Sequence, residues 1–160
     1  SAASDVYKRQ ELEQIRTTVF RQLMFAEFEL YTHESLEKGI PLTSEDYSKA
    51  WHELNVKYFG PEMIVDENID IEWARIPHFY SDFYVYQYAT GYAAASAFAN
   101  AILEGKVNAV EKYKGFLKSG GSDYPIEILK KAGVDMTTKE PLEATIKRFN
   151  ELLDMIEKVK

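Results

Sequence analysis

Cysteine and long apolar runs are both missing from this sequence of 160 residues. Without cysteine the chain has no disulfide framework, no thiolate ligand for zinc and no cysteine nucleophile, and it fits a reducing cytoplasm. No window of about eighteen apolar residues occurs, so we expect no contact with a membrane. Positive charge is also scarce, since the formal net charge is −7. That balance argues against a nucleic-acid partner, because a protein that binds phosphates normally shows a basic patch.

Helical periodicity dominates the chain, and no strand pattern competes with it. Apolar residues recur at steps of three and four from Glu11 to Gly39, which predicts one long helix that Gly39 ends. Thr43 or Ser44 is placed to cap a second helix that runs to Gly60. An acidic loop is expected at 61–71, and further helices are expected at 107–118, 125–132 and 141–159. The sequence therefore predicts a single all-α unit, a multi-helix bundle.

The stretch from Glu72 to Gly105 is the most distinctive part of the chain. It begins as a loop around Pro77 and ends in a run of small residues at 93–97, which would let another backbone approach closely. We therefore expect a central helix that is packed on most sides. Between these parts lies a cluster of tyrosines, and buried tyrosine hydroxyls need hydrogen-bond partners. The cluster comprises Tyr80, Tyr84, Tyr86, Tyr88 and Tyr92.

Two of the three histidines stand in His-Glu pairs, but neither completes the H-E-x-x-H pattern of a zinc peptidase helix. His33 is followed four residues later by Glu37, and His52 is followed by Val56. Glu29, His33 and Glu37 share one helix face, and this pattern allows a weak metal site. A solvated charged face, with an ion pair to a neighbouring lysine, is the preferred interpretation.

His78 has a different setting, because Pro77 disfavours helix for the residue before it and the chain turns there. A histidine on a turn beside tyrosines is placed to donate a hydrogen bond to a bound carbonyl or oxyanion. A histidine bonded inside the core remains the alternative. Tyr80, Tyr84, Tyr88 and Tyr92 follow one another in four-residue steps and are expected to share a broad helix face. Tyr86 points about 160° away from Tyr84. One set of tyrosines could line a site while the other packs.

The first ten residues, SAASDVYKRQ, resemble a translated sequencing adapter. Segments of this kind are excluded from reasoning about the fold. We predict that residues 1–10 are an adapter scar and that the natural sequence starts near Glu11.

Four separated stretches carry a resemblance to a known family. They are TVFRQLMFAEFE at 18–29, WARIPHFYSDFYVYQYATGYAAA at 73–95, FLKSGGSDYPIEILKKAGVDM at 116–136 and EPLE at 140–143. Together they are similar to the C-terminal part of oligoendopeptidase F, a family of zinc metallopeptidases related to thimet oligopeptidase. The resemblance covers residues 11–160 and implies the C-terminal helical part of a zincin-like catalytic domain.

In that family zinc is held by an H-E-x-x-H helix and a further glutamate, both expected upstream of Glu11. The resemblance therefore implies that zinc belongs to the full-length enzyme and that its ligands lie outside this chain, which alone would be an inactive fragment. It implies short peptides as substrates and the missing N-terminal part of the polypeptide as a partner. It assigns His78 and Tyr86 to stabilising the tetrahedral intermediate, and His78, Tyr80, Tyr84 and Tyr86 to substrate binding.

Two assignments stay open. Relatives with a glycine-rich loop between this histidine and its tyrosines have extra residues there, so either Tyr84 or Tyr86 could face the cleft. Arg75 could join the site or anchor its loop through an ion pair. The alternative to a peptidase fragment is a non-catalytic helical module that holds a peptide or a partner helix.

Overall fold

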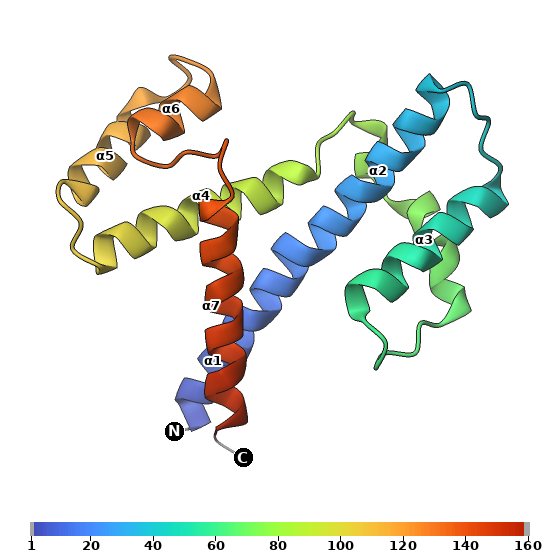
Figure 1. Ribbon diagram of the computed structural model, residues 1–160, viewed down its shortest axis with the longest axis horizontal. Helices are drawn as coiled ribbons and strands as arrows, with labels where there is room; N and C mark the ends of the chain where they lie inside the picture. The colour runs from blue at the N-terminus through green and yellow to red at the C-terminus, as the bar shows by residue number, and fades with distance from the viewer. Residues whose placement is uncertain (1, 159–160) are drawn as a thin grey trace. The chain divides into compact units, whose positions relative to one another are not determined.

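The computed structural model describes residues 2–158, and side chains from Asp5 onward. No strand occurs within these residues, so the all-α prediction is confirmed (Figure 1). The α-helices are α1 (Ala2–Ile15), α2 (Arg21–Glu37), α3 (Ser44–Phe59), α4 (Tyr86–Leu103), α5 (Ala109–Ser119), α6 (Pro125–Lys131) and α7 (Glu140–Glu157). A π-helical turn, η1 (Arg16–Phe20), and two 3-10 helices, η2 (Glu67–Arg75) and η3 (Pro77–Tyr80), complete the chain.

The chain forms two compact units where its sequence pattern predicts one. One unit combines the chain up to Ile15 with the chain from Thr90 onward, and the other runs from Arg16 to Ala89. Neither boundary falls in a loop, because one lies at the π-helical turn and the other lies within α4. Composition therefore offers no linker signal at either point.

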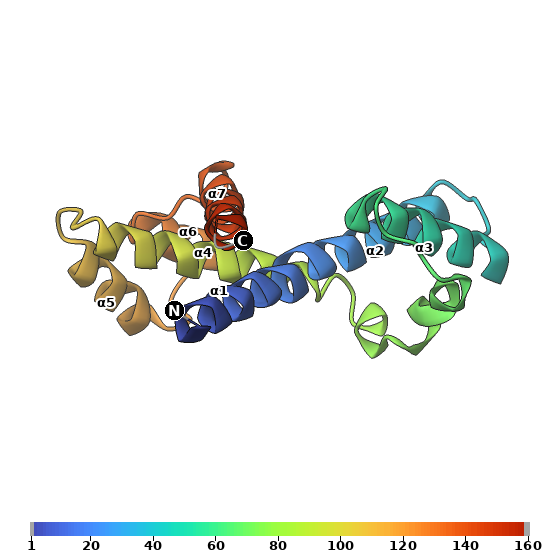
Figure 2. The same cartoon turned by 90° about the horizontal axis from the view of Figure 1, so that it is seen from below.

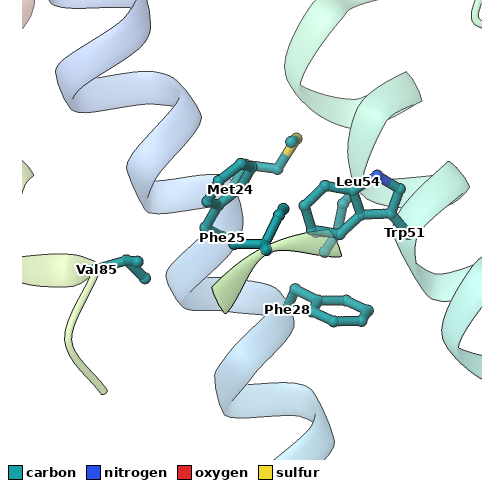
Figure 3. Close-up of a cluster of buried hydrophobic side chains, with 7 residues drawn as sticks. Met24, Phe25, Phe28, Trp51, Leu54 and Val85 are labelled. Carbon is teal, nitrogen blue, oxygen red and sulfur yellow. The ribbon is translucent and has the colours of Figure 1, made fainter. Parts of the chain in front are cut away.

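An aromatic cluster forms the core of the 16–89 unit. The indole of Trp51 on α3 is fully buried, and Phe25 and Phe28 of α2 pack their rings against it at centroid distances of 5.2 Å and 5.0 Å (Figure 3). Trp73 of η2 extends the cluster through Phe28. Aromatic pairs at such distances contribute beyond their buried area. The core therefore fixes α2, α3 and η2 together.

The ends of the predicted helices follow local rules. The Thr43 hydroxyl accepts a hydrogen bond from the Asp46 amide, and the Asp46 side chain accepts one from the Thr43 amide, so Thr43 is the cap of α3. Gly39 follows α2 with a φ of 71°, as expected of a residue that ends a helix in the left-handed region. The predicted end of the last helix at Val159 lies outside the described residues.

Two parts of the sequence prediction need correction. The expected helix from Glu11 to Gly39 is interrupted by η1, and the expected loop at 61–71 runs into η2. Inside η2 the buried carboxylate of Glu72 accepts a hydrogen bond from Arg21 at 2.6 Å and another from Arg75. Arg75 thus anchors its loop, and this pairing explains why a charged segment without a helical stripe is ordered.

The other unit joins both ends of the described chain. Glu11 of α1 accepts two hydrogen bonds from the Arg148 guanidinium of α7, each 2.9 Å long. α5 and α6 lie side by side in both views (Figure 1, Figure 2). Phe98 of α4 packs against Tyr113 and Phe116 of α5.

α4 is not packed on most sides, contrary to the expectation for this helix. It buries one stripe, Ala89, Ala93, Ala94 and Phe98, while Leu103 is 84% exposed. Four-residue spacing along a helix places buried residues on a single face, so the small-residue run supplies one narrow contact. No helix within residues 2–158 is long and apolar enough to cross a membrane.

Candidate active site

Two buried apolar residues and a partly buried phenylalanine hold the segment that carries His78. Ile76 and Val85 belong to the aromatic core and are 5% and 0% exposed. Phe79 lies between them in sequence, and its ring centroid is 5.6 Å from that of Phe25 and 5.3 Å from that of Phe28. Because these residues point into the core, their neighbours in sequence point outward. The segment therefore presents polar side chains from a rigidly anchored backbone.

His78 meets two tyrosines on this outward side. Its imidazole lies parallel to the Tyr84 ring, with centroids 5.4 Å apart and 6° between the planes. Tyr88, one helical turn into α4, packs edge-on against both, at 6.3 Å from His78 and 5.6 Å from Tyr84. All three rings are exposed. Their polar atoms can reach a ligand in solvent.

The remaining predicted residues lie elsewhere around the segment. Tyr80 ends η3 and is 83% exposed. Residues 81–85 are not helical, so the four-residue step that was expected to align Tyr80 with Tyr84 does not apply to it. Tyr86 starts α4 and is half-exposed. At 100° per residue it leaves the helix about 160° away from Tyr88, which faces His78.

A left-handed turn precedes Tyr84. Asp82 and Phe83 have φ values of 29° and 56°, in a region that residues other than glycine seldom occupy. The Phe83 amide donates a hydrogen bond of 2.6 Å to the buried carboxylate of Glu29 on α2. The Phe83 ring packs against His33, one turn further along α2, with centroids 4.5 Å apart.

Sequence reasoning missed two members of this arrangement. Tyr88 was expected on the same face as Tyr84 from its four-residue step but was not assigned to the site. Glu29 could not have been found, because its partner is a backbone amide of a turn that no residue pattern announces. The spacing of Glu29, His33 and Glu37 allowed a weak metal site, whereas in the structure Glu29 and His33 both contact Phe83.

The described residues do not fit a metal centre. Nowhere between residues 2 and 158 do three side chains of the ligating types come together in a group that could hold an ion. His52, the other histidine of the unit, bonds to Asp70 with 2.7 Å between Nδ1 and Oδ1.

The chemistry available at the His78 cluster is hydrogen-bond donation. The Tyr88 hydroxyl donates to the Tyr84 hydroxyl, and this bond, with a smaller effect of burial, raises the pKa of Tyr88. The oxygens are 3.5 Å apart, which is long for two hydroxyl groups. A small movement would free either hydroxyl, so the cluster can offer protonated phenols and an imidazole to an acceptor such as a peptide carbonyl.

Comparison with known proteins gives the family of the chain. Residues 3–148 match the model of "Peptidase family M3". This match begins inside the segment predicted to be an adapter scar, and the origin of residues 1–10 stays a prediction. Oligopeptidase PepF of Bacillus subtilis is 55% identical over 148 residues, which is 92% of this chain and 22% of that protein. The oligoendopeptidase F homologue of Borreliella burgdorferi is 47% identical over 152 residues, or 95% of this chain and 26% of that protein.

A solved structure agrees with these matches. The crystal structure of oligoendopeptidase-F from Enterococcus faecium aligns with a TM-score of 0.89 and 47% sequence identity, covering 96% of this chain and 30% of that one. The chain thus spans about a quarter of the length of the curated relatives it matches.

Proposed function

This chain belongs to peptidase family M3, and from that premise we propose that it forms the substrate-binding wall of a cytoplasmic zinc metallopeptidase that cleaves short peptides. Zinc and the general base are assigned to residues outside this sequence, in the N-terminal part of the same polypeptide. The segment itself is expected to be inactive.

The observation that carries the proposal is the stack of His78 on Tyr84 on an exposed surface. In peptide hydrolysis the carbonyl oxygen of the scissile bond gains negative charge as water adds to the carbon. Donors aimed at that oxygen lower the barrier, because they interact more strongly with the oxyanion than with the carbonyl. The stack supports His78 and Tyr84 as residues that hold the substrate. On the family resemblance we assign the oxyanion role to His78 and Tyr86, and assign His78, Tyr80, Tyr84 and Tyr86 to holding the substrate.

The proposal is tested in a chimera, in which residues 11–160 replace the matching segment of the Bacillus subtilis peptidase. Sequence identity of 55% makes this exchange conservative. His78→Ala and Tyr86→Phe should each lower turnover of a fluorogenic peptide by about 10²–10³, the effect of losing one oxyanion donor. Zinc content per chain should stay unchanged. Tyr124→Phe, which removes an exposed hydroxyl in the other unit, is the control.

Unchanged turnover in both site variants would refute the assignment of these residues. Peptide cleavage by the 160-residue chain alone, or a tight one-to-one zinc site in calorimetry, would contradict the proposal that metal and base lie elsewhere. An inactive chimera, together with peptide binding by the chain alone, would instead support a non-catalytic peptide-binding module.

A further inference from the structure

Glu29 is a buried carboxylate whose partner is a backbone amide. Its side chain is 2% exposed, Oε1 accepts from the Phe83 amide, and Oε2 has no partner among the described residues. Burying a carboxylate is costly unless hydrogen bonds replace its lost hydration. Glu72, the other buried glutamate of this unit, also has an Oε2 without a partner, but two guanidinium groups contact its Oε1 and balance its charge. Glu29 is thus retained with far less compensation than its neighbour.

The amide that Glu29 binds belongs to a backbone that needs support. Asp82 and Phe83 both have positive φ. For residues other than glycine this conformation is unfavourable in free energy, and it persists only where surrounding contacts hold it. Glu29 holds the Phe83 amide, and His33 covers the Phe83 ring. Glu29 and His33 are four residues apart on α2, so one face of the helix contacts both the amide and the ring of Phe83.

These two contacts to Phe83 fix the backbone next to Tyr84, and so affect where the Tyr84 ring lies. Val85, the residue after Tyr84, is sealed in the core, and Phe83 before it is fixed to α2. With both neighbours held, the backbone at Tyr84 is fixed in position, and from there its ring lies parallel to the His78 imidazole. A released Phe83 would leave Tyr84 free to turn away.

We propose that Glu29 is a positioning residue, which locks the 82–83 turn and thereby holds Tyr84 stacked on His78. As a deepening of the proposed function, this rests on the peptidase role of that pair. Glu29 touches neither substrate nor the reacting atoms. Its effect on peptide hydrolysis is transmitted through the Phe83 amide.

The test uses two substitutions that fill the same space. Glu29→Gln keeps an oxygen that can accept from the Phe83 amide. Glu29→Met is similar in volume but removes the acceptor, and a buried apolar side chain of equal size is usually tolerated. Proton NMR of the 160-residue chain then reports the stack, because the Tyr84 ring current moves the ring protons of His78 upfield.

The three histidines make assignment simple, with His33→Gln, His52→Gln and His78→Gln identifying one signal each. Tyr84→Leu supplies the unstacked reference position. We expect the Gln variant at Glu29 to keep the upfield position of His78 and the Met variant to lose it, moving to the reference. A Met variant that keeps the upfield position would overturn the proposal. The His52 signal should not move in either variant, since Asp70 holds that ring.

Amide exchange keeps the inference testable if the Met variant does not fold. In the unaltered chain the Phe83 amide should exchange slowly, because its hydrogen is bonded to a carboxylate that solvent barely reaches. Exchange at the rate of an unstructured peptide would overturn the proposal without any substitution.

The chimera separates this inference from the proposed function. There Glu29→Met should lower turnover by about 10²-fold, because a His78 imidazole without the Tyr84 ring beside it can shift by roughly 1 Å, and Glu29→Gln should restore it. If His78→Ala leaves turnover intact while the NMR result holds, the peptidase assignment fails and the positioning role stands. If His78→Ala lowers turnover while Glu29→Met leaves the NMR signal unmoved, the positioning role fails alone.

Discussion

The imidazole of His78 and the phenol ring of Tyr84 are stacked nearly parallel, with 6° between the ring planes and 5.4 Å between the centroids. Tyr86, two residues later, leaves α4 on the side opposite Tyr88, which packs against the same imidazole. The two tyrosines that the family resemblance leaves open therefore differ in their relation to His78. Steady-state kinetics can therefore distinguish the roles of Tyr84 and Tyr86.

We predict that Tyr84→Phe in the chimera raises KM for the peptide and leaves kcat nearly unchanged. A hydroxyl that binds the substrate equally in the ground state and in the transition state contributes to binding alone. Tyr86→Phe should lower kcat by about 10²–10³, as expected of a donor to the oxyanion. Initial rates over a range of peptide concentrations measure both constants. The reverse pattern would assign the oxyanion to Tyr84, the tyrosine stacked on His78.

The aromatic core makes a strong prediction for stability. Phe28 is buried and contacts Trp51 and Phe79 at 5.0 Å and 5.3 Å. Phe28→Ala should lower the free energy of unfolding by about 3–5 kcal/mol, because it removes a buried ring and leaves a cavity. Urea unfolding gives the difference. Leu36→Ala, at a mostly exposed position on the same helix, should change stability by no more than about 0.5 kcal/mol.

The α3 cap yields a smaller and more local effect. Thr43→Ala removes the hydroxyl that accepts from the Asp46 amide and should cost about 0.5–2 kcal/mol. Thr43→Ser keeps the oxygen and should restore most of this loss. Ser44→Ala is the neighbouring control, since the Ser44 hydroxyl bonds only to the exposed Glu45 carboxylate. Equal losses at both positions would argue against the capping role of Thr43.

The ion pair between α2 and α3 predicts a pH dependence. Lys57 donates a hydrogen bond of 2.5 Å to Glu27, and this bond is the main reason why the pKa of Glu27 lies below its ordinary 4.5. Burial raises the pKa of Glu27, and the hydrogen bond from the Tyr58 hydroxyl lowers it further. Since the folded pKa is the lower one, the pair stabilises the fold above about pH 4.5 and this contribution is lost as the pH falls through the folded pKa.

Lys57→Met should therefore lower the free energy of unfolding near pH 7 by about 0.2–1 kcal/mol, the usual range for an exposed pair. The difference from the unaltered chain should shrink as the pH falls below about 4.5, where Glu27 becomes protonated. Unfolding in urea at several pH values measures it. A difference that stays constant with pH would show that Lys57 acts through packing rather than through the charge of Glu27.

Residue patterns predicted those parts of the fold that depend on neighbours in sequence. The cap of α3 and the end of α2 at Gly39 follow from single residues with strong local preferences. The helices of the second half were placed to within about two residues by their apolar spacing, a scatter that is normal for helix ends. These features need no knowledge of what packs against them.

Patterns failed where contacts distant in sequence decide the structure. η2 is held by Glu72 pairing with Arg21, 51 residues away, and no local signal marks that contact. The turn at Asp82 and Phe83 is held by Glu29, 54 residues away, and it breaks the tyrosine periodicity that was read as one helix face. The candidate site follows directly on contacts of this kind, so its residue types could be named but their partners could not.

Both tryptophans of the sequence, Trp51 and Trp73, lie in the aromatic core of the 16–89 unit. Indole fluorescence therefore monitors that core alone, while circular dichroism senses the helices of the whole chain. Melting curves recorded by the two methods will coincide if the molecule unfolds in one step. They will separate if the halves lose their structure independently, and the optical silence of the other half then becomes an internal measure of cooperativity.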